Sequence, residues 1–270
     1  MGKYLKTLKI SLLNTFIYRY NYITSCLINI LSTTILILLW RSIYLFSGNV
    51  GSYTLSSMLL YIFIANTVFD LIDTSSTAST VSDDIRLGQL NNYLIRPFSY
   101  FFYQFAQECG TKVTKLPITI SVYGVLGALL FTLLNVTDIS FTISITSLLF
   151  FFAFILLSFF WNFMLDYLLG TLGFWIENPW VVFFIKGEII MFLCGLAIPI
   201  DLFPPFLRSF LEYLPFKYYV FFPYKILNGT VAFNECMWNL LLLIAWVGGI
   251  SLFTYIVWKR SVKNYTATGG

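Results

Sequence analysis

The chain has 270 residues, of which 59% are apolar and only 10% are charged, whereas a typical soluble domain carries about 25% charged residues. So few charges cannot cover the surface of a water-soluble protein of this length, and the same composition excludes disorder. The sequence contains no histidine, which excludes histidine general bases and histidine zinc ligands. The net charge of +4 is too small to predict a nucleic-acid partner. The composition therefore predicts a membrane protein.

Six apolar stretches are long enough to cross the ~30 Å hydrocarbon core of a bilayer, which takes about 20 residues of helix. They are Tyr22–Phe46, Ser52–Ile72, Leu116–Leu134, Phe141–Phe163, Trp180–Ile200 and Cys236–Trp258. Most lysines and arginines lie before the first stretch, between the second and third, and after the sixth. Because Lys and Arg accumulate on the cytoplasmic side, both termini are predicted to be cytoplasmic. The sequence thus predicts an all-α polytopic membrane protein with six transmembrane helices in one domain, residues 1–270.

Residues 1–21 are the first of three segments that are not spans. Most leucines between Leu5 and Tyr20 share one broad helical face with several lysines beside it, which predicts an N-terminal interfacial helix in the cytoplasmic headgroup layer. Lys9 falls inside the apolar arc and has to extend its ammonium group toward water. The alternative is a basic flank that only orients the first span.

The second segment, residues 73–115, is the longest polar stretch and is predicted to be cytoplasmic. Ser82–Asp84 resembles a capped helix start, with a hydroxyl and two acids at the positive end of the dipole. Leu87, Leu90 and Leu94 then follow as a short apolar stripe. This pattern predicts a short cytoplasmic amphipathic helix.

Aromatic residues follow this predicted helix directly. Pro97 ends it, because the residue before a proline avoids helical geometry. Six aromatic residues between Phe98 and Phe105 are typical of a membrane interface. The apolar stripe needs a partner to cover it, and the alternative is that it folds back on the spans of the protein itself.

The third segment, residues 199–229, contains most of the eight prolines yet is strongly apolar. Prolines this dense exclude one spanning helix, and non-helical backbone at membrane depth must be buried in protein or line a cavity. The segment is predicted to be a pair of short helices that enter the outer leaflet and return. Pro205 suits the first turn of one of them, and Arg208 and Glu212 are spaced to pair on its polar face. The alternative is an external amphipathic helix without a role in transport.

Ionisable residues are scarce inside the predicted spans. Lys186 and Glu188 lie within the fifth stretch and are candidates to cap a cytoplasmic cavity, unless this span begins later. Asp70 and Asp166 fall near cytoplasmic ends, where headgroup water accounts for them. The four cysteines stand far apart and predict neither disulfides nor a metal site. Because the mid-span positions are almost uncharged and no P-loop motif occurs, the energy source is predicted to be external to the chain.

The cytoplasmic segment Ile85–Pro97 reads IRLGQLNNYLIRP. It resembles the Gly-Thr-Leu-Asp…Leu-Leu-x-Arg-Pro signature of type-2 ABC exporter permeases, especially the paired-permease branch formerly described as uncharacterised transport permeases. Gln89 and Asn91 replace the usual Thr and Asp, so no role is assigned to them. The resemblance implies a coupling helix that contacts an ATP-binding subunit through Ile85, Leu87, Gly88, Leu90, Leu94, Arg96 and Pro97.

The external segment is similar to the proline-marked re-entrant hairpin that precedes the last span in the same family. The resemblance implies that this hairpin closes the external side of the transport path. The residues that it assigns to this external gate are Pro199, Phe203, Pro204, Pro215, Phe216, Pro223 and Gly229.

The resemblance covers the whole chain and implies a transport subunit without an ATPase site, catalytic residues, metal or cofactor of its own. It implies a second permease, identical or a sister chain, and a separate subunit that binds ATP and Mg²⁺, in the plasma membrane of a bacterium. The aromatic lining predicts a lipid-like or amphiphilic cargo that moves out of the cytoplasm. The alternatives are an importer permease, a secondary carrier or channel, and a membrane-embedded lipid-modifying enzyme.

Overall fold

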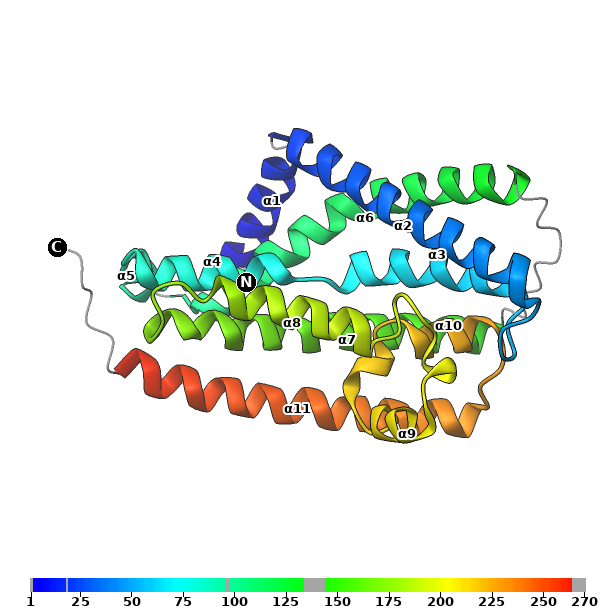
Figure 1. Cartoon of the computed structure of the whole chain (residues 1–270). Helices are drawn as coiled ribbons and strands as arrows, with labels where there is room; N and C mark the ends of the chain where they lie inside the picture. The colour runs from blue at the N-terminus through cyan, green and yellow to red at the C-terminus, as the bar shows by residue number, and fades with distance from the viewer. Residues whose placement is uncertain (1, 18, 96–97, 134–143, 264–270) are drawn as a thin grey trace.

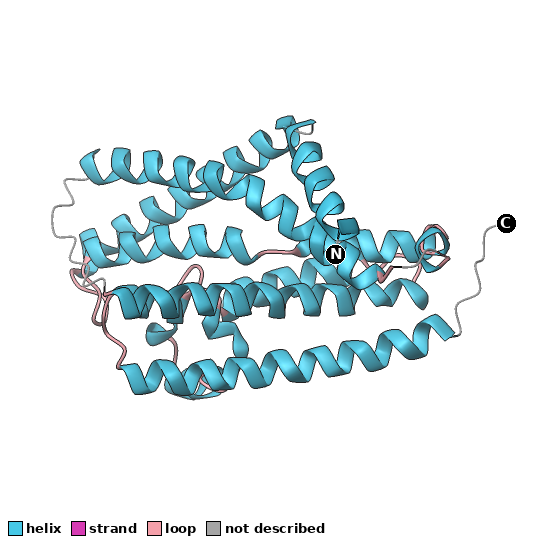
Figure 2. Ribbon diagram, turned by 180° about the vertical axis from the view of Figure 1, so that it is seen from behind, coloured by secondary structure: helices cyan, strands magenta, loops and turns pink. Residues whose placement is uncertain are grey.

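A computed structural model describes residues 2–17, 19–95, 98–133 and 144–263, and the protein is all-helical over these residues. Most helices run along one long axis, with α2 and α6 on one side, α11 on the other, and α3, α4, α7 and α8 between them (Figures 1 and 2). The α-helices are α1 Gly2–Ile17, α2 Arg19–Ser47, α3 Leu55–Ile72, α4 Ser75–Arg86, α5 Asn91–Leu94, α6 Tyr100–Leu133, α7 Ile145–Gly170, α8 Trp180–Leu193, α9 Pro205–Leu211, α10 Phe221–Leu227 and α11 Phe233–Lys263. The 3₁₀ turns are η1 Thr171–Phe174, η2 Ile200–Leu202 and η3 Pro215–Tyr218.

Four helical stretches in the described part of the chain are long and apolar enough to cross a membrane. They are Ile23–Phe46, Leu55–Arg86, Ile145–Phe174 and Phe233–Lys263, and they contain most of the first, second, fourth and sixth predicted spans. The third predicted span falls within α6, which ends at Leu133 beside residues that the structure does not describe. The fifth, Trp180–Ile200, is not one helix, because α8 ends after 14 residues, or about 21 Å. Gly195, at φ +83°, then turns the chain, so six spans stay a prediction.

A break separates α3 from α4 and corrects the prediction for the cytoplasmic segment. The chain leaves the helical conformation at Asp73 (φ −59°, ψ 124°), and the Asp73 carboxylate accepts hydrogen bonds from the backbone N–H and the hydroxyl of Ser75, at 3.2 and 3.1 Å. The helix therefore restarts at Ser75. The prediction that Ser82–Asp84 starts a helix is wrong, because these residues lie in the last turns of α4.

Helix α4 packs against α7 at distances that only glycine permits. A Cβ atom on Gly170 would lie 2.6 Å from Cβ of Val81 and 3.0 Å from the carbonyl oxygen of Ala78. A Cβ on Gly173, in η1, would lie 2.8 Å from the carbonyl oxygen of Ser82. Because Ala78 and Val81 are fully buried, this contact, and not water, covers the apolar face of α4.

Replacing Gly170 with alanine should destabilise the protein by about 1–3 kcal/mol, because the added methyl group overpacks a contact that includes backbone. Gly187→Ala in α8 is the matched control, since nothing lies within 4 Å of a Cβ there and alanine favours a helix over glycine by roughly 0.5–1 kcal/mol. Thermal unfolding in detergent measures both. A Gly170→Ala protein as stable as Gly187→Ala would contradict the close α4–α7 contact.

The N-terminal segment is helical, as predicted, from Gly2 to Ile17. Helix α1 packs on α6, where the Ser11 hydroxyl donates a 2.7 Å hydrogen bond to the carbonyl of Gln107. Gly110 of α6 makes the approach possible, since a Cβ there would lie 2.7 Å from Cβ of Ser11. A position of α1 in the headgroup layer stays a prediction.

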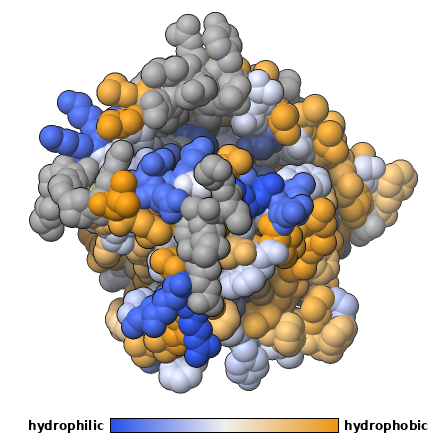
Figure 3. Space-filling model, turned by 90° about the vertical axis from the view of Figure 1, so that its left-hand side faces the viewer, coloured by the Kyte–Doolittle hydropathy of each residue, from blue (hydrophilic) through white to orange (hydrophobic). Residues whose placement is uncertain are grey.

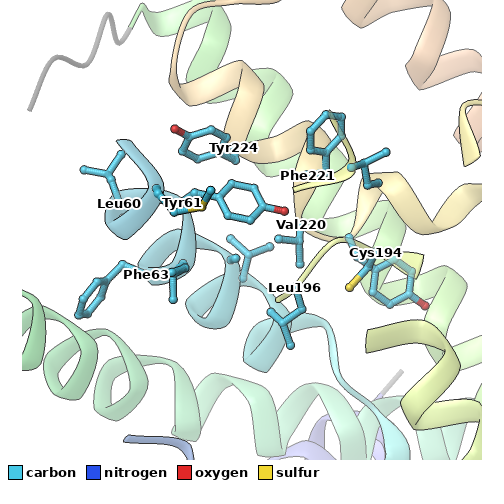
Figure 4. Close-up of a cluster of buried hydrophobic side chains, with 14 of the residues drawn as sticks. Leu60, Tyr61, Phe63, Cys194, Leu196, Val220, Phe221 and Tyr224 are labelled. Atoms are coloured by element: carbon cyan, nitrogen blue, oxygen red, sulfur yellow. The ribbon is translucent and has the colours of Figure 1, made fainter. Parts of the chain in front are cut away.

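The external segment folds, as predicted, into short helices with Pro205 in the first turn of α9. It packs into the main core of the protein beside α3 (Figure 4). Tyr61 of α3 donates a hydrogen bond to the carbonyl of Gly195, and its ring meets that of Tyr224 edge to face at 4.8 Å. The depth of this segment in a membrane stays a prediction.

Candidate functional site

The first candidate site is the turn that follows α4, at the end of the molecule where α5 and the C-terminal end of α11 lie (Figure 1). Gly88 adopts φ +72°, a left-handed conformation that glycine adopts without strain, and it reverses the chain into the four-residue helix α5. Arg96 and Pro97, which the resemblance assigns to the same site, lie outside the described residues.

The predicted leucine stripe does not form one exposed face. Leu90 is fully buried, and its backbone N–H donates a 2.8 Å hydrogen bond to the carbonyl of Asp84. Ile85 is also buried. Both side chains thus anchor the turn to the protein and are not on its surface in this structure, and their assignment to an ATPase contact stays a prediction.

Three other apolar side chains project from this turn. Leu87 is 68%, Leu94 44% and Ile95 82% exposed, and we call these three residues the coupling tip. Hydrophilic side chains gather around the centre of this end of the molecule, and hydrophobic ones surround them (Figure 3). We take these three exposed apolar side chains as a candidate contact surface.

The aromatic residues after Pro97 hold the turn in place. Tyr93 of α5 packs on the ring of Tyr100 at 5.1 Å, and Tyr100 donates a 2.6 Å hydrogen bond to the buried carboxylate of Asp84. Gln104 donates a second bond to this carboxylate at 3.1 Å. Phe101 packs on Phe163 of α7 at 5.5 Å. The aromatic residues of this group thus serve partly as a protein core, and not only as the membrane-interface anchor predicted from the sequence.

The second candidate site is a buried ion pair between α7 and α8. The Lys186 ammonium group lies 2.9 Å from a carboxylate oxygen of Asp166, and the two side chains are only 11% and 1% exposed. Lys186 also donates to the amide oxygen of Asn162 at 3.1 Å. Glu188 is exposed on α8. The structure therefore does not bring Lys186 and Glu188, the two candidate cavity charges, to the same site. Headgroup water does not account for Asp166, because protein groups surround it.

The polar groups around this pair hold the break between α3 and α4. Thr74, at the break, donates to Asp166 at 2.7 Å. Asn162 donates to the carbonyl of Ile72 at 3.1 Å and to the hydroxyl of Thr74 at 2.9 Å. The last carbonyl groups of a helix have no hydrogen-bond donor within that helix. Here the Asn162 side chain donates to one of them, the carbonyl of Ile72 at the end of α3.

The same cluster reaches the external segment, and a separate hydrogen bond joins α6 to the end of α3. Tyr219, just after η3, donates a 2.8 Å hydrogen bond to the amide oxygen of Asn162. Lys112 of α6 donates to the carbonyl of Asp70 in the last turn of α3 at 2.8 Å. We call Thr74, Asn162, Asp166, Lys186 and Tyr219 the buried junction. It joins the helix break to α7, α8 and the external segment.

The residues predicted for the external gate divide into a buried and an exposed group. Pro199, Phe203, Pro215 and Pro223 are buried and Phe216 is partly so, whereas Pro204 and Gly229 are exposed. The ion pair predicted between Arg208 and Glu212 is present at 3.9 Å, and Arg208 also lies 3.5 Å from Asp201. No observation here tests whether these residues form a gate.

Comparison with known families gives one result that decides the class of the protein. The sequence pattern of the ABC-2 family transporter proteins matches residues 6–269. The chain belongs to this family. A comparison with curated proteins found no match. The resemblance to type-2 ABC permeases is thereby confirmed, and the chain is a membrane protein of an ABC transporter, a class in which the permease normally works with an ATP-binding subunit.

Sequence reasoning missed Asn162, Thr74 and Tyr219 as members of the junction of this ABC-2 protein. One signal was present, since Asn162 and Asp166 are four residues apart and therefore share a helix face in an otherwise apolar stretch. Thr74 and Tyr219 carry no such signal. They come from segments far apart in the sequence, and only the fold brings them together.

Proposed function

We propose that the chain is the membrane-spanning subunit of an ATP-driven exporter and that two such permeases pair, each on a separate ATP-binding subunit. The coupling tip carries this proposal. Its side chains are exposed and apolar and belong to the segment that resembles the family signature, in which Leu94 matches a signature position. The buried side chains of Ile85 and Leu90 anchor this turn to the protein. The separate subunit binds ATP and Mg²⁺, and this chain contributes no catalytic group.

The orientation of the chain follows from the same end of the molecule. The last turns of α11 carry Arg260 and Lys263, and they lie at the end that carries α5 (Figure 1). Basic residues mark the cytoplasmic side of a membrane protein. We therefore place the coupling tip and both termini in the cytoplasm, with six crossings in total, of which α8 together with the external segment provides the fifth.

The buried junction provides a path from the coupling tip to the external side. Helix α4 carries the tip at one end and begins at the helix break at the other. A force on the tip moves α4 relative to α3, and the junction links this break to Lys186 of α8 and Tyr219 of the external segment. ATP binding drives this movement only if the ATPase binds one state of the permease more tightly than the other. The aromatic external segment favours a lipid-like or amphiphilic cargo.

Reconstitution tests the proposal. The chain should co-purify with an ABC ATPase, and vesicles that contain the complex should move a fluorescent phospholipid or amphiphilic dye only when ATP is present. Vesicles that contain the chain alone should move none, with or without an ion gradient. Uphill transport by the chain alone on an ion gradient would show a secondary carrier and contradict the proposal.

A further inference from the structure

A cavity lies on the external side, between the external segment and the first turns of α11, where α9 lies beside α11 (Figure 1). Its volume is about 380 Å³, which is within the range of small-molecule sites and far above the ~30 Å³ share of one water molecule. Six charged residues line it, three of them basic and three acidic: Asp201, Arg208, Glu212, Lys217, Lys225 and Glu235. We call this cavity the external pocket.

Part of this charge is already paired on one wall of the pocket. Asp201 lies 3.5 Å from Arg208 and 3.8 Å from Lys225, and Arg208 also reaches Glu212 at 3.9 Å. The ammonium group of Lys225 lies 5.1 Å from the centre of the Phe221 ring. These contacts fix the wall, and its two cations, Arg208 and Lys225, still line the cavity.

The remaining two charges face the same cavity without an ion pair. Within the part of the chain that the structure describes, neither Lys217 nor Glu235 lies within ion-pair distance of an opposite charge. Lys217 instead lies over the ring of Tyr218 at 5.0 Å, close enough to Glu212 and Glu235 to be attracted by both. The pocket thus presents a cation and carboxylates with a gap between them.

This arrangement selects for a ligand that carries both signs of charge. The carboxylates of Glu212 and Glu235 would repel a ligand that is only an anion, and Lys217 would repel one that is only a cation. A molecule with an amine and a phosphate satisfies both sets, with its phosphate at the basic groups and its amine at the carboxylates. The exposed rings of Tyr213 and Trp238 also line the pocket, and such amphipathic rings are typical of the level of lipid headgroups.

We propose that the external pocket binds a zwitterionic headgroup that contains an amine and a phosphate. The inference requires that the chain is a membrane permease, but it does not depend on the cargo or on the direction of transport. Two sources share this chemistry, a phosphoethanolamine lipid in the outer leaflet and the free headgroup in solution.

Native mass spectrometry of the purified protein measures the binding. Dioleoyl phosphatidylethanolamine should bind more tightly than dioleoyl phosphatidylglycerol, which has the same chains and phosphate but no amine. Lys217→Gln should weaken binding of the ethanolamine lipid about tenfold, because a charge-assisted hydrogen bond is lost, and Lys217→Arg should restore it. Glu235→Gln should remove the preference for the ethanolamine lipid.

Two variants with the same chemical changes at exposed positions outside the pocket serve as controls. Lys259→Gln and Glu177→Gln should leave the binding of both lipids unchanged. Competition by glycerophosphoethanolamine would assign the site to the free headgroup, and its absence would assign the site to the lipid, and both outcomes support the proposal. Equal binding of the two lipids, or a Lys217→Gln protein that binds like its control, would overturn it. Because transport is not measured, failure here leaves the proposed export function standing.

Discussion

A protein in which methionine replaces Lys186 should lose about 3–5 kcal/mol of stability, because the change leaves the carboxylate of Asp166 buried without its partner. Asp166 is 1% exposed, so water cannot take the place of the ammonium group. Asp166→Asn should also be costly, since it leaves Lys186 unpaired, although the amide oxygen still accepts the hydrogen bond from Thr74. The free energy of unfolding, measured by titration with SDS in mixed micelles, reports both losses.

The double variant Lys186→Met/Asp166→Asn tests whether the two charged side chains stabilise each other directly. It should lose much less than the sum of the two single changes, because no unpaired charge is left in the protein, and coupling energies of contacting pairs reach roughly 3 kcal/mol. Lys259→Met, on the exposed surface of α11, is the matched control and should stay within about 0.5 kcal/mol of the original protein. Additive single effects, or a Lys186→Met protein as stable as this control, would show that the pair is not buried in the folded protein.

The buried junction also shows where sequence reasoning reached its limit. Lys186 is visible in the sequence, because a lysine within an apolar stretch is unusual. Its partner Asp166 lies near a predicted span end, where the sequence indicates only headgroup water, because distance from a span end says nothing about what packs around a carboxylate. Thr74 and Tyr219 are unremarkable residues in the sequence, and hydrogen bonds between the α3–α4 break, α7 and the external segment are a property of the tertiary structure alone.

Helix α4 was missed for a different physical reason. Its segment is rich in serine and threonine, which are typical of caps and turns, so the sequence predicts only a polar cytoplasmic stretch there. The buried residues Ala78, Val81 and Ile85 nevertheless recur at helical spacing. Gly170 and Gly173 then let α7 and η1 approach this small face closely. Small residues on facing helices replace large apolar side chains here, and hydropathy alone does not detect this kind of packing.

The segment that resembles the family signature, in contrast, does contain a turn, at Gly88, and its contact with an ATPase stays a prediction. The signature could not tell which leucines face outward. The helical spacing of Leu87, Leu90 and Leu94 suggested one stripe, but the left-handed Gly88 interrupts the helix between the first two. Leu90 therefore turns inward while its two neighbours in the pattern remain exposed, and this difference can be tested.

Replacing both Leu87 and Ile95 with aspartate should separate the permease from its ATPase without unfolding it. Burial of each side chain against a partner contributes about 1.5–3 kcal/mol, so the double variant should bind the ATPase at least roughly 100-fold more weakly. Transport-linked ATP hydrolysis should fall with it. Co-purification and ATPase activity of the reconstituted complex measure the effect, and thermal unfolding of the permease alone should stay unchanged.

Two further variants make this expectation specific to the coupling tip. Ile145, which like Ile95 is 82% exposed, begins α7 at the opposite end of the molecule (Figure 1), so Ile145→Asp should leave ATPase binding intact. Leu90→Asp should instead unfold or strongly destabilise the permease, because it places a charge in a fully buried position. If the double tip variant still binds the ATPase and couples hydrolysis to transport, the ATPase contacts another surface, and the path from the tip through α4 to the junction does not carry the transport stroke.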